Sequence, residues 1–251
     1  MMPRLFAPVS AVVLAAALAL PASAMDLTEL TEAERAQFRA EVRAYLMDNP
    51  QVIMEAVELL QSREAEAQAQ ADVNMVSDNA AAIFDDGYSW VGGNPEGDIT
   101  LVEFLDYRCG YCKRAHGEVA KLLETDGNIR IIVKELPILG EDSVLASRFA
   151  IATKQVEGGD AYKAMNDALM AYSGSITVPA MRRIAETLDL DADAIEARMD
   201  SEEVTQEIAQ TRALAQTLQI SGTPTFVVHD EMLRGYLPYD QMRAIVDDKR
   251  G

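Results

Sequence analysis

The sequence predicts an α/β domain that carries a large all-helical insertion and is preceded by a helical segment. Two apolar strands, Ile99–Leu105 and Ile129–Leu136, enclose a helical stretch from about Gly110 to Glu124. Their near-continuous apolar character is typical of a buried, partly parallel sheet, and the order is that of a strand–helix–strand unit. Helical patterns then fill Asp142 to Gln219.

The end of the chain completes this pattern with a hairpin and a helix. Short strands are predicted at Thr225–His229 and Met232–Tyr236, followed by a helix from about Tyr239 to Asp248. We therefore place the α/β domain, the catalytic domain of the paragraphs below, at residues 84–251, with the helical insertion at about 141–219. Turn residues between 85 and 95 predict a loop-rich boundary in front of the core of this domain.

Residues 1–24 have the pattern of a secretory signal peptide. Met1–Arg4 is a short positive start, Ala11–Leu20 is apolar, and Ala22–Ala24 is a small-residue cleavage site. The apolar run is too short to span a bilayer, and the alternative is an uncleaved amphipathic anchor. We expect export to the periplasm without membrane insertion, where disulfide chemistry is permitted.

The charge of the chain excludes some partners. It carries 41 acidic and 22 basic residues, a formal net charge of −19. Such a surface repels nucleic acid and anionic lipid, so neither is an expected partner.

A helical segment is predicted at residues 25–83. Thr31 and Glu34 have capping-box spacing, and Asn49-Pro50 ends one helix and begins the next. The second helix has a weak apolar stripe and runs into SREAEAQAQAD, which leaves little to bury. Two alternatives stay open, because the segment could pack on the catalytic domain or on copies of itself. Sustained heptads are absent from the sequence, which argues against a long coiled coil.

Cys109 and Cys112 are the only cysteines, and they stand where the first strand passes into the helix. Unpaired N–H groups and the dipole at a helix N-terminus stabilise a thiolate at Cys109. Cys112 lies one turn further along the same face, so the pair can switch between dithiol and disulfide. The first cysteine attacks and the second resolves the mixed disulfide. This redox pair needs no other cofactor.

Other uses of the two cysteines fit the sequence less well. A structural disulfide would close too short a loop to stabilise the fold much. A zinc site would have at most three ligands with His116, and covalent haem needs histidine where Lys113 stands. We therefore expect no metal. A Cu(I)-binding protein is an alternative of another class, although the twelve methionines are scattered and His116 and His229 are the only histidines.

Glu103 interrupts the strand before the cysteines. It shares a face with Leu101 and Leu105, which predicts an inward-pointing carboxyl. A buried carboxyl has a raised pKa and can exchange a proton with Cys112. The alternative is that Glu103 lies in water at the edge of the sheet.

Pro224 stands at the entry of a later strand, directly after Thr223. Proline there is commonly an ordinary turn residue. A cis peptide is the alternative, and it would expose the Thr223 backbone for pairing with an extended substrate.

The combination of LVEFLDYRCGYC, the helical insertion, GTPTFVV and LRGYLPYDQMRAIV resembles the DsbA-type thioredoxin-fold family from about Val91 onward. The resemblance implies that Cys109 is the nucleophile, that Cys112 is the resolving thiol and that Glu103 is the buried acid. It also implies that Thr223-Pro224 forms a cis-proline loop beside the active site. The substrate would contact this loop and also Gly110 and Tyr111.

Gly110-Tyr111 departs from the strongly oxidising members of that family, which carry Pro-His between the cysteines. This chain lacks the histidine that stabilises the thiolate there. We therefore expect a protein that reduces or isomerises disulfides. The alternative is a monomeric DsbA-like dithiol oxidase that introduces them.

The stretch DNPQVIMEAV ahead of the CGYC domain resembles the ScsC-like branch, the suppressor of copper sensitivity proteins. Members of that branch include trimers built through an N-terminal helical extension, with disulfide isomerase activity. The resemblance implies a homo-oligomer, a homotrimer joined through residues 26–82. Its substrates would be unfolded or misoxidised exported proteins, and a membrane redox partner would reset its thiols.

Overall fold

The computed structural model describes residues 30–251, so the predicted signal peptide lies outside the described residues. The described chain divides into two compact units, one ending at Leu60 and the other spanning Gln61–Gly251. The sequence-based boundary lies at residue 83 instead. Residues 61–83 group with the second unit because Val76 and Ile83 are buried in its core.

The first unit contains α1 (Glu32–Asp48) and the first turns of α2 (Gln51–Asp78). The predicted capping box is present, since the Thr31 hydroxyl accepts from the Glu34 N–H at 3.3 Å and the Glu34 carboxylate accepts from the Thr31 N–H at 2.9 Å. The break at Asn49 is also as predicted. Large apolar side chains of this unit are exposed: Phe38, Val42, Tyr45, Met47, Ile53, Met54, Val57, Leu59 and Leu60.

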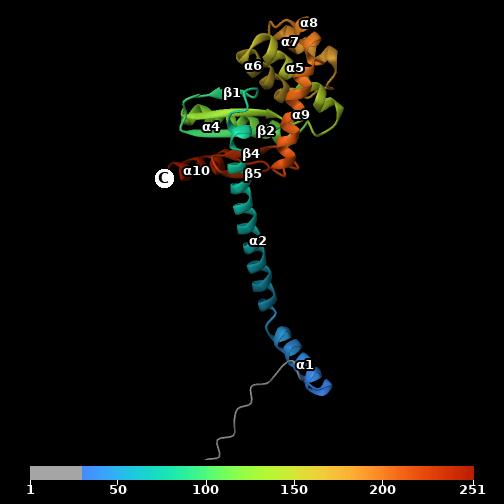
Figure 1. Ribbon diagram of the computed structural model, residues 1–251, viewed down its shortest axis with the longest axis vertical. Coiled ribbons are helices and arrows are strands. Elements are labelled where there is room, and N and C mark those ends of the chain that lie inside the picture. The colour runs from blue at the N-terminus through green and yellow to red at the C-terminus, as the bar shows by residue number, and fades with distance from the viewer. Residues whose placement is uncertain (1–29) are drawn as a thin grey trace, which may run out of the picture. The chain divides into compact units, whose positions relative to one another are not determined.

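The second unit is built on a five-stranded sheet of order β1-β3-β2-β4-β5 (Figure 1). Its strands are β1 (Trp90–Gly93), β2 (Ile99–Leu105), β3 (Ile129–Glu135), β4 (Thr225–Val228) and β5 (Glu231–Arg234). The pair β2–β3 is parallel, and the other pairs are antiparallel. The central strand is therefore β2, the strand that leads to the cysteines.

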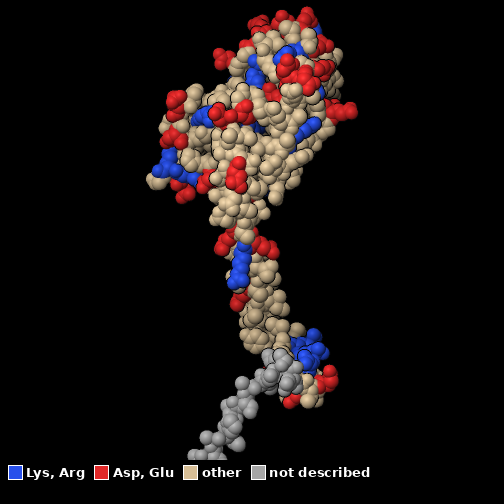
Figure 2. Space-filling view, viewed as in Figure 1, with Lys and Arg blue, Asp and Glu red and all other residues tan. Residues whose placement is uncertain are grey.

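The helices confirm the predicted thioredoxin fold with a helical insertion. The insertion consists of α5 (Glu141–Glu157), α6 (Gly159–Ala171), α7 (Val178–Thr187), α8 (Ala192–Met199) and α9 (Glu202–Thr217). Outside it lie α3 (Ala80–Phe84), α4 (Gly110–Asp126) and α10 (Tyr239–Arg250). On the face in Figure 2, acidic side chains outnumber basic ones over the insertion, in keeping with the net charge of the chain.

Strand β1 corrects the sequence-based expectation of a loop around residues 92–95. It is short, its sequence WVGG ends in two glycines, and these turn-forming residues hide the strand signal. Gly93 has a positive φ of 67°, and a Cβ there would lie 2.4 Å from the Ile129 carbonyl oxygen. Trp90 connects strand β1, at the edge of the sheet, to the insertion, because its indole N–H donates to the Gly159 carbonyl at 2.9 Å.

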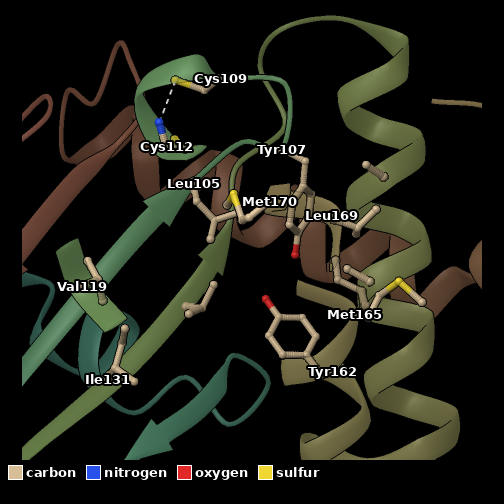
Figure 3. Close-up of a cluster of buried hydrophobic side chains, with 14 of the residues drawn as sticks. Leu105, Tyr107, Cys109, Cys112, Val119, Ile131, Tyr162, Met165, Leu169 and Met170 are labelled. Carbon is tan, nitrogen blue, oxygen red and sulfur yellow. Dashed lines mark hydrogen bonds between the residues drawn. The ribbon is translucent and has the colours of Figure 1, made fainter. Parts of the chain in front are cut away.

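The two faces of the sheet bury different cores, as the alternation of β2 requires. Leu101 and Leu105 point to the core shared with α4 and the insertion, where Val119 and Ile131 also lie (Figure 3). Val102 and Phe104 point to the other face, which is covered by the end of α2, by α3 and by the end of α9. Helix α4 and most of the insertion therefore lie on the same face of the sheet, and the end of α9 lies on the other.

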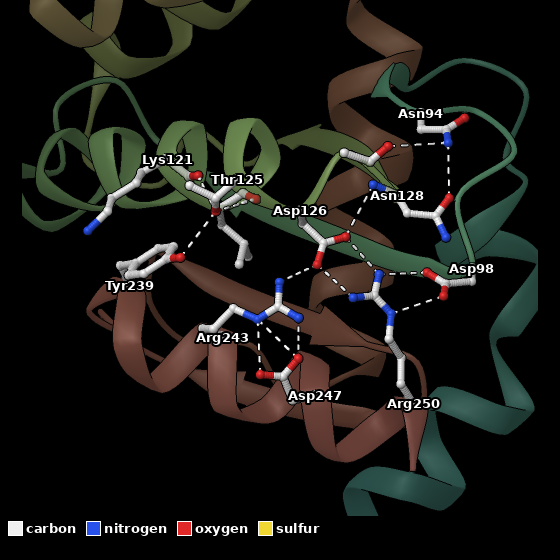
Figure 4. Close-up of polar contacts among 12 residues, drawn as sticks. Asn94, Asp98, Lys121, Thr125, Asp126, Asn128, Tyr239, Arg243, Asp247 and Arg250 are labelled. Carbon is white, nitrogen blue, oxygen red and sulfur yellow. Dashed lines mark hydrogen bonds and ion pairs between the residues drawn. The ribbon is translucent and has the colours of Figure 1, made fainter.

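An ion-pair network fastens α10 to the C-terminal end of α4 and to the start of β2 (Figure 4). The Arg250 guanidinium contacts Asp98 at 2.7 Å and Asp126 at 2.7 Å, and Arg243 also pairs with Asp126. Hydrogen bonds from Arg250 hold the pKa of Asp126 well below its usual value. The end of α4 is thereby joined to the start of β2 and to the last helix.

Lys134 forms a buried ion pair on the α3 side of the sheet. Its side chain is 0% exposed, and its ammonium group donates to Asp86 at 2.5 Å and to the Ala82 carbonyl at 2.9 Å. Burial alone would raise the pKa of Asp86, but hydrogen bonds from Lys134 and Ser89 lower it. The pair holds the loop before β1 against the sheet.

We expect Lys134→Met to destabilise the protein by about 3–5 kcal/mol, because it leaves the Asp86 carboxylate buried without its partner. The double variant Lys134→Met/Asp86→Asn removes that charge and should recover most of the loss. Guanidinium unfolding followed by the fluorescence of Trp90, the only tryptophan, measures both. A double variant no more stable than Lys134→Met would contradict the account.

Candidate active site

The turn between β2 and α4 is held by the buried carboxylate of Asp106. One oxygen accepts from the Ser143 hydroxyl at 2.8 Å, and the other accepts from the backbone N–H groups of Ile138 and Leu139 at 2.8 and 3.0 Å. The Cys109 N–H donates to the Asp106 carbonyl at 3.0 Å. Asp106 therefore joins the cysteine turn to the loop after β3 and to the start of α5.

Cys109 is the N-cap of α4, where the sequence placed it. Its Sγ accepts from the Cys112 N–H at 3.4 Å (Figure 3). Cys109 retains 7% exposure, whereas Cys112 is 0% exposed. Burial raises the pKa of the Cys112 thiol, and the charges of Cys109 and then Glu103 raise it further. The two cysteines are thus unequal, with Cys109 slightly exposed and Cys112 fully enclosed as a thiol.

The Thr223–Pro224 peptide is cis, which settles the alternative left open by the sequence. The Cys109 Sγ–H donates to the Thr223 carbonyl at 3.1 Å. The loop before β4 therefore lies directly beside the first cysteine, more than a hundred residues away in the chain.

Glu103 is buried in the middle of β2, with 2% exposure, so the edge-in-water alternative is wrong. Its neighbours across the sheet are Val133 on β3 and Phe226 on β4. Within residues 30–251, its Oε1 atom has no hydrogen-bond partner. Burial, and then the charge of Glu135, raises the pKa of Glu103 to about 8. A carboxyl with this pKa can both hold and release a proton near neutral pH.

Glu135 is a second buried carboxyl, which the sequence analysis missed. Its Oε1 accepts from the Tyr107 hydroxyl at 2.7 Å and the Tyr162 hydroxyl at 2.6 Å, and its Oε2 accepts from the Ser147 hydroxyl at 2.7 Å. Burial raises its pKa to about 7, although these hydroxyl groups oppose the rise. The signal was available, since Glu135 interrupts an apolar strand as Glu103 does.

Gly110 and Tyr111, the other predicted substrate contacts, line the outer side of the site. A Cβ on Gly110 would meet open space, and Tyr111 is 56% exposed. The Arg114 guanidinium lies 4.9 Å from the centre of the Tyr111 ring and 5.7 Å from that of Tyr236. The space next to Cys109 is therefore bordered by an exposed aromatic and cationic group.

The two histidines have other places in the fold. His116 Nε2 is 2.7 Å from Asp167 Oδ1 on α6, and His229 follows β4. No group of three or more potential metal ligands occurs within the part of the chain that the structure describes.

A dithiol at a helix N-terminus, a buried carboxyl on the preceding strand and a cis-proline loop beside the first sulfur together define a thioredoxin-fold redox site. The DSBA-like thioredoxin domain family matches residues 100–247. The chain belongs to this family of DsbA-type thiol–disulfide oxidoreductases. The N-terminal domain of the copper resistance protein ScsC matches residues 34–67, which makes the chain ScsC-like.

Solved structures agree with this assignment. A thioredoxin-like oxidoreductase from Silicibacter pomeroyi is 44% identical, with a TM-score of 0.64, covering 68% of this chain and 96% of that one. The thiol–disulfide exchange protein α-DsbA2 from Wolbachia pipientis is 27% identical, with a TM-score of 0.68 and coverages of 72% and 97%. A linker-deletion variant of Proteus mirabilis ScsC is 25% identical, with a TM-score of 0.64 and coverages of 89% and 98%.

Curated relatives include proteins that are much longer. The match to the Na⁺/H⁺ antiporter NhaA 3 of Salinispora tropica is 30% identical and covers 62% of this chain but 24% of the antiporter. The chain thus spans about a quarter of that relative. Disulfide bond formation protein D of Bacillus subtilis is 22% identical, with coverages of 62% and 74%. Among residues 30–251, no helix is long and apolar enough to cross a bilayer.

The raised pKa of Glu103 predicts a pH-dependent stability. The folded state binds this proton more tightly than the unfolded chain does, so the stabilisation is complete below about pH 4.5 and is lost as the pH rises toward 8. Glu103→Gln cannot ionise and should escape this loss. Between pH 5 and 8, the free energy of unfolding of wild type should fall by roughly 2–4 kcal/mol relative to that of the variant.

Guanidinium unfolding of the reduced proteins at several pH values measures this difference. Glu124→Gln, at an exposed carboxyl on α4, is the matched control and should follow wild type. Equal losses in wild type and Glu103→Gln would show that Glu103 ionises normally.

Proposed function

We propose that this chain is a periplasmic thiol–disulfide interchange protein that reduces and isomerises disulfides in exported proteins. The inequality of the two sulfurs carries the proposal. Cys109, next to Thr223, keeps a slight exposure of 7%, and Cys112 is enclosed with a raised pKa. A nucleophile must be reachable by substrate, whereas a resolving thiol must wait until a mixed disulfide has formed.

The reaction begins when the Cys109 thiolate attacks one sulfur of a substrate disulfide. The substrate S–S bond breaks, a Cys109–substrate disulfide forms, and the other substrate sulfur leaves as a thiolate that takes up a proton. In reduction, Cys112 gives its proton to the Glu103 carboxylate and attacks the Cys109 sulfur. The second substrate thiolate then leaves, and the protein keeps the Cys109–Cys112 disulfide.

In isomerisation, the mixed disulfide ends differently. Another substrate cysteine attacks its own sulfur in the mixed disulfide, and Cys109 leaves as the thiolate with which it started. The redox state of the protein is unchanged. This route needs a Cys109 that is a good leaving group and a Cys112 that reacts slowly, and the raised pKa of Cys112 favours that balance.

The surroundings of Cys109 support binding of unfolded polypeptide. Tyr111, Ile138 and Leu139 expose apolar surface. The last two lie in the loop that Asp106 holds against the cysteine turn. An extended substrate segment would pair with the Thr223 backbone and place its disulfide over Cys109. Gly110 leaves room for this approach.

The cellular setting follows from the predicted signal peptide at residues 1–24 and from the ScsC-like N-terminal region. Exported proteins with wrong disulfides would be the substrates. A membrane redox partner would return the Cys109–Cys112 disulfide to the dithiol after each reduction.

A homo-oligomer, with a trimer as the expected state, belongs to the same proposal. The nine exposed apolar side chains on α1 and on the first turns of α2 are more than a solvated helix pair needs. Burying them between copies would join several active sites in one particle. Isomerisation benefits from this arrangement because one substrate meets several cysteines.

Replacing the nucleophile tests the chemistry. Cys109→Ser should abolish the refolding of ribonuclease that carries scrambled disulfides. Cys112→Ser should instead accumulate a covalent complex with substrate, because the mixed disulfide cannot be resolved by the protein. Non-reducing gels detect that complex. Retained refolding by Cys109→Ser would refute the assignment of the nucleophile.

Sedimentation equilibrium of the mature protein tests the assembly, with a mass of three chains expected. Ile53→Glu introduces a charge among the exposed apolar residues of the first unit and should shift the protein to monomers. Leu139→Glu, which alters an equally exposed residue of the catalytic unit, should not. A monomeric wild type would refute the oligomer.

Two alternative functions, a dithiol oxidase and a Cu(I)-binding protein, predict different experimental results. A dithiol oxidase would form disulfides in reduced ribonuclease faster than it repairs scrambled ribonuclease. Copper binding is favoured by the name of the matched N-terminal family, copper resistance protein ScsC. A Cu(I) site would protect both thiols of the reduced protein from alkylation when Cu(I) is added.

A further inference from the structure

The site contains two buried carboxyls on one face of the sheet. The parallel register pairs Glu103 with Val133 and Leu105 with Glu135, so Glu103 and Glu135 lie two positions apart on adjacent strands. Residues two apart on a strand point to the same side. Both side chains therefore enter the core below the cysteines.

The hydrogen bonds of the two carboxyls differ in a way that assigns their charges. Asn166 Nδ2 donates to the Tyr107 hydroxyl at 3.0 Å, which leaves that hydroxyl to donate to Glu135. Tyr162 and Ser147 also donate to Glu135. Three hydroxyl donors fit a carboxylate. Glu103 has no donor on Oε1, which fits a neutral carboxyl.

Glu135 is also connected to the cysteine turn. Tyr107 stands two residues before Cys109, and Figure 3 shows the hydroxyl groups of Tyr107 and Tyr162 pointing toward each other. Both hydroxyls reach the same carboxylate oxygen of Glu135. The carboxylate thus bridges the turn, β3 and α6.

The charged and titratable groups that face Glu135 come from every neighbouring element. Glu103 faces it from β2, Tyr107 from the turn and Tyr162 from α6. Lys154 on α5 is the nearby cation, and its charge lowers the pKa of Glu135. On α4, Cys112 lies within range of the charge of Glu103.

We propose that Glu135 is a positioning residue of the redox site, whose negative charge keeps the proton on Glu103 and whose hydrogen bond to Tyr107 holds the turn before Cys109. This proposal rests on the proposed thiol–disulfide exchange. It extends that exchange from one buried acid to a pair with divided roles. Glu135 carries the charge, and Glu103 carries the mobile proton.

The two carboxyls, Glu103 and Glu135, determine the pH at which Cys112 can lose its proton in the resolving step. In the resolving step, the proton of the Cys112 thiol moves to Glu103, so Glu103 must first be ionised. A negative Glu135 opposes that ionisation and makes Glu103 a stronger base once it is ionised. With Glu135 neutral, Glu103 would ionise at lower pH and accept the proton less readily.

Glu135→Gln tests the inference, because the amide removes the charge and can still accept from Tyr107 and Tyr162. Carbon-13 NMR of the reduced protein with labelled glutamate carboxyls follows the titration of Glu103. Its midpoint should fall by about one pH unit, as expected when a like charge on the neighbouring strand is removed. The pH at which glutathione disulfide oxidises the dithiol at half-maximal rate should fall with it.

Glu118→Gln is the matched control. Its carboxylate also accepts two hydrogen bonds, from the Tyr236 hydroxyl and the Tyr239 N–H, but it lies outside the pair. The Glu103 midpoint should stay as in wild type. An unchanged midpoint in folded Glu135→Gln would overturn the inference.

The reciprocal variant keeps the test decisive if Glu135→Gln does not fold. In the proposed order Glu135 titrates while Glu103 is still protonated, so Glu103→Gln should leave the Glu135 midpoint near its wild-type value, below the midpoint of Glu103. A Glu135 midpoint above that of Glu103 in wild type overturns the inference, because Glu103 would then carry the charge. Failure of wild type to refold scrambled ribonuclease, with the midpoint shifts observed, would instead reject the proposed function and keep the carboxyl pair.

Discussion

The need to satisfy buried polar groups governs the structure around the cysteines. An ionisable side chain removed from water is costly unless hydrogen bonds or an opposite charge replace its hydration. Asp106 receives backbone and hydroxyl donors, Glu135 receives three hydroxyls, and Lys134 faces Asp86. Each of these contacts joins segments that are distant in the sequence, so satisfying the polar groups also assembles the site.

Glu103 departs from that rule. Its Oε1 atom is the one buried side-chain oxygen or nitrogen within residues 30–251 that lacks a hydrogen-bond partner. A carboxyl without donors is neutral near pH 7, and a neutral carboxyl can take part in proton exchange. The satisfied neighbours hold the backbone on both sides of Glu103, and this rigidity keeps the isolated carboxyl in place. Departures of this kind are expected at functional sites.

Much of this could be predicted from the sequence. The strand Ile99–Leu105 and the start of the helix at Gly110 were predicted to the residue, because apolar runs and capping patterns are local signals. The inward position of Glu103 followed from strand alternation. The insertion followed from helical periodicity. These features depend on neighbours within a few residues.

The remaining features depend on contacts that no local pattern contains. Strand β1 exists because Trp90 and its neighbours pair with β3, although two glycines in four residues predict a turn. Glu135 interrupts an apolar strand, which is a local signal, but its hydrogen-bond donors come from the turn and from two helices of the insertion, and no local pattern contains those contacts. The grouping of residues 61–83 with the catalytic unit likewise depends on Val76 and Ile83 meeting the sheet.

The net charge of −19 and the buried pair of carboxyls act at different ranges. Surface charges are screened over about 8–10 Å at physiological ionic strength, and the acidic side chains seen in Figure 2 are solvated. Glu103 and Glu135 interact through protein, where screening by salt is weak. Proton exchange with Cys112 is therefore controlled by two residues of one sheet face, and changes in surface charge should alter encounter with substrate far more than the resolving step.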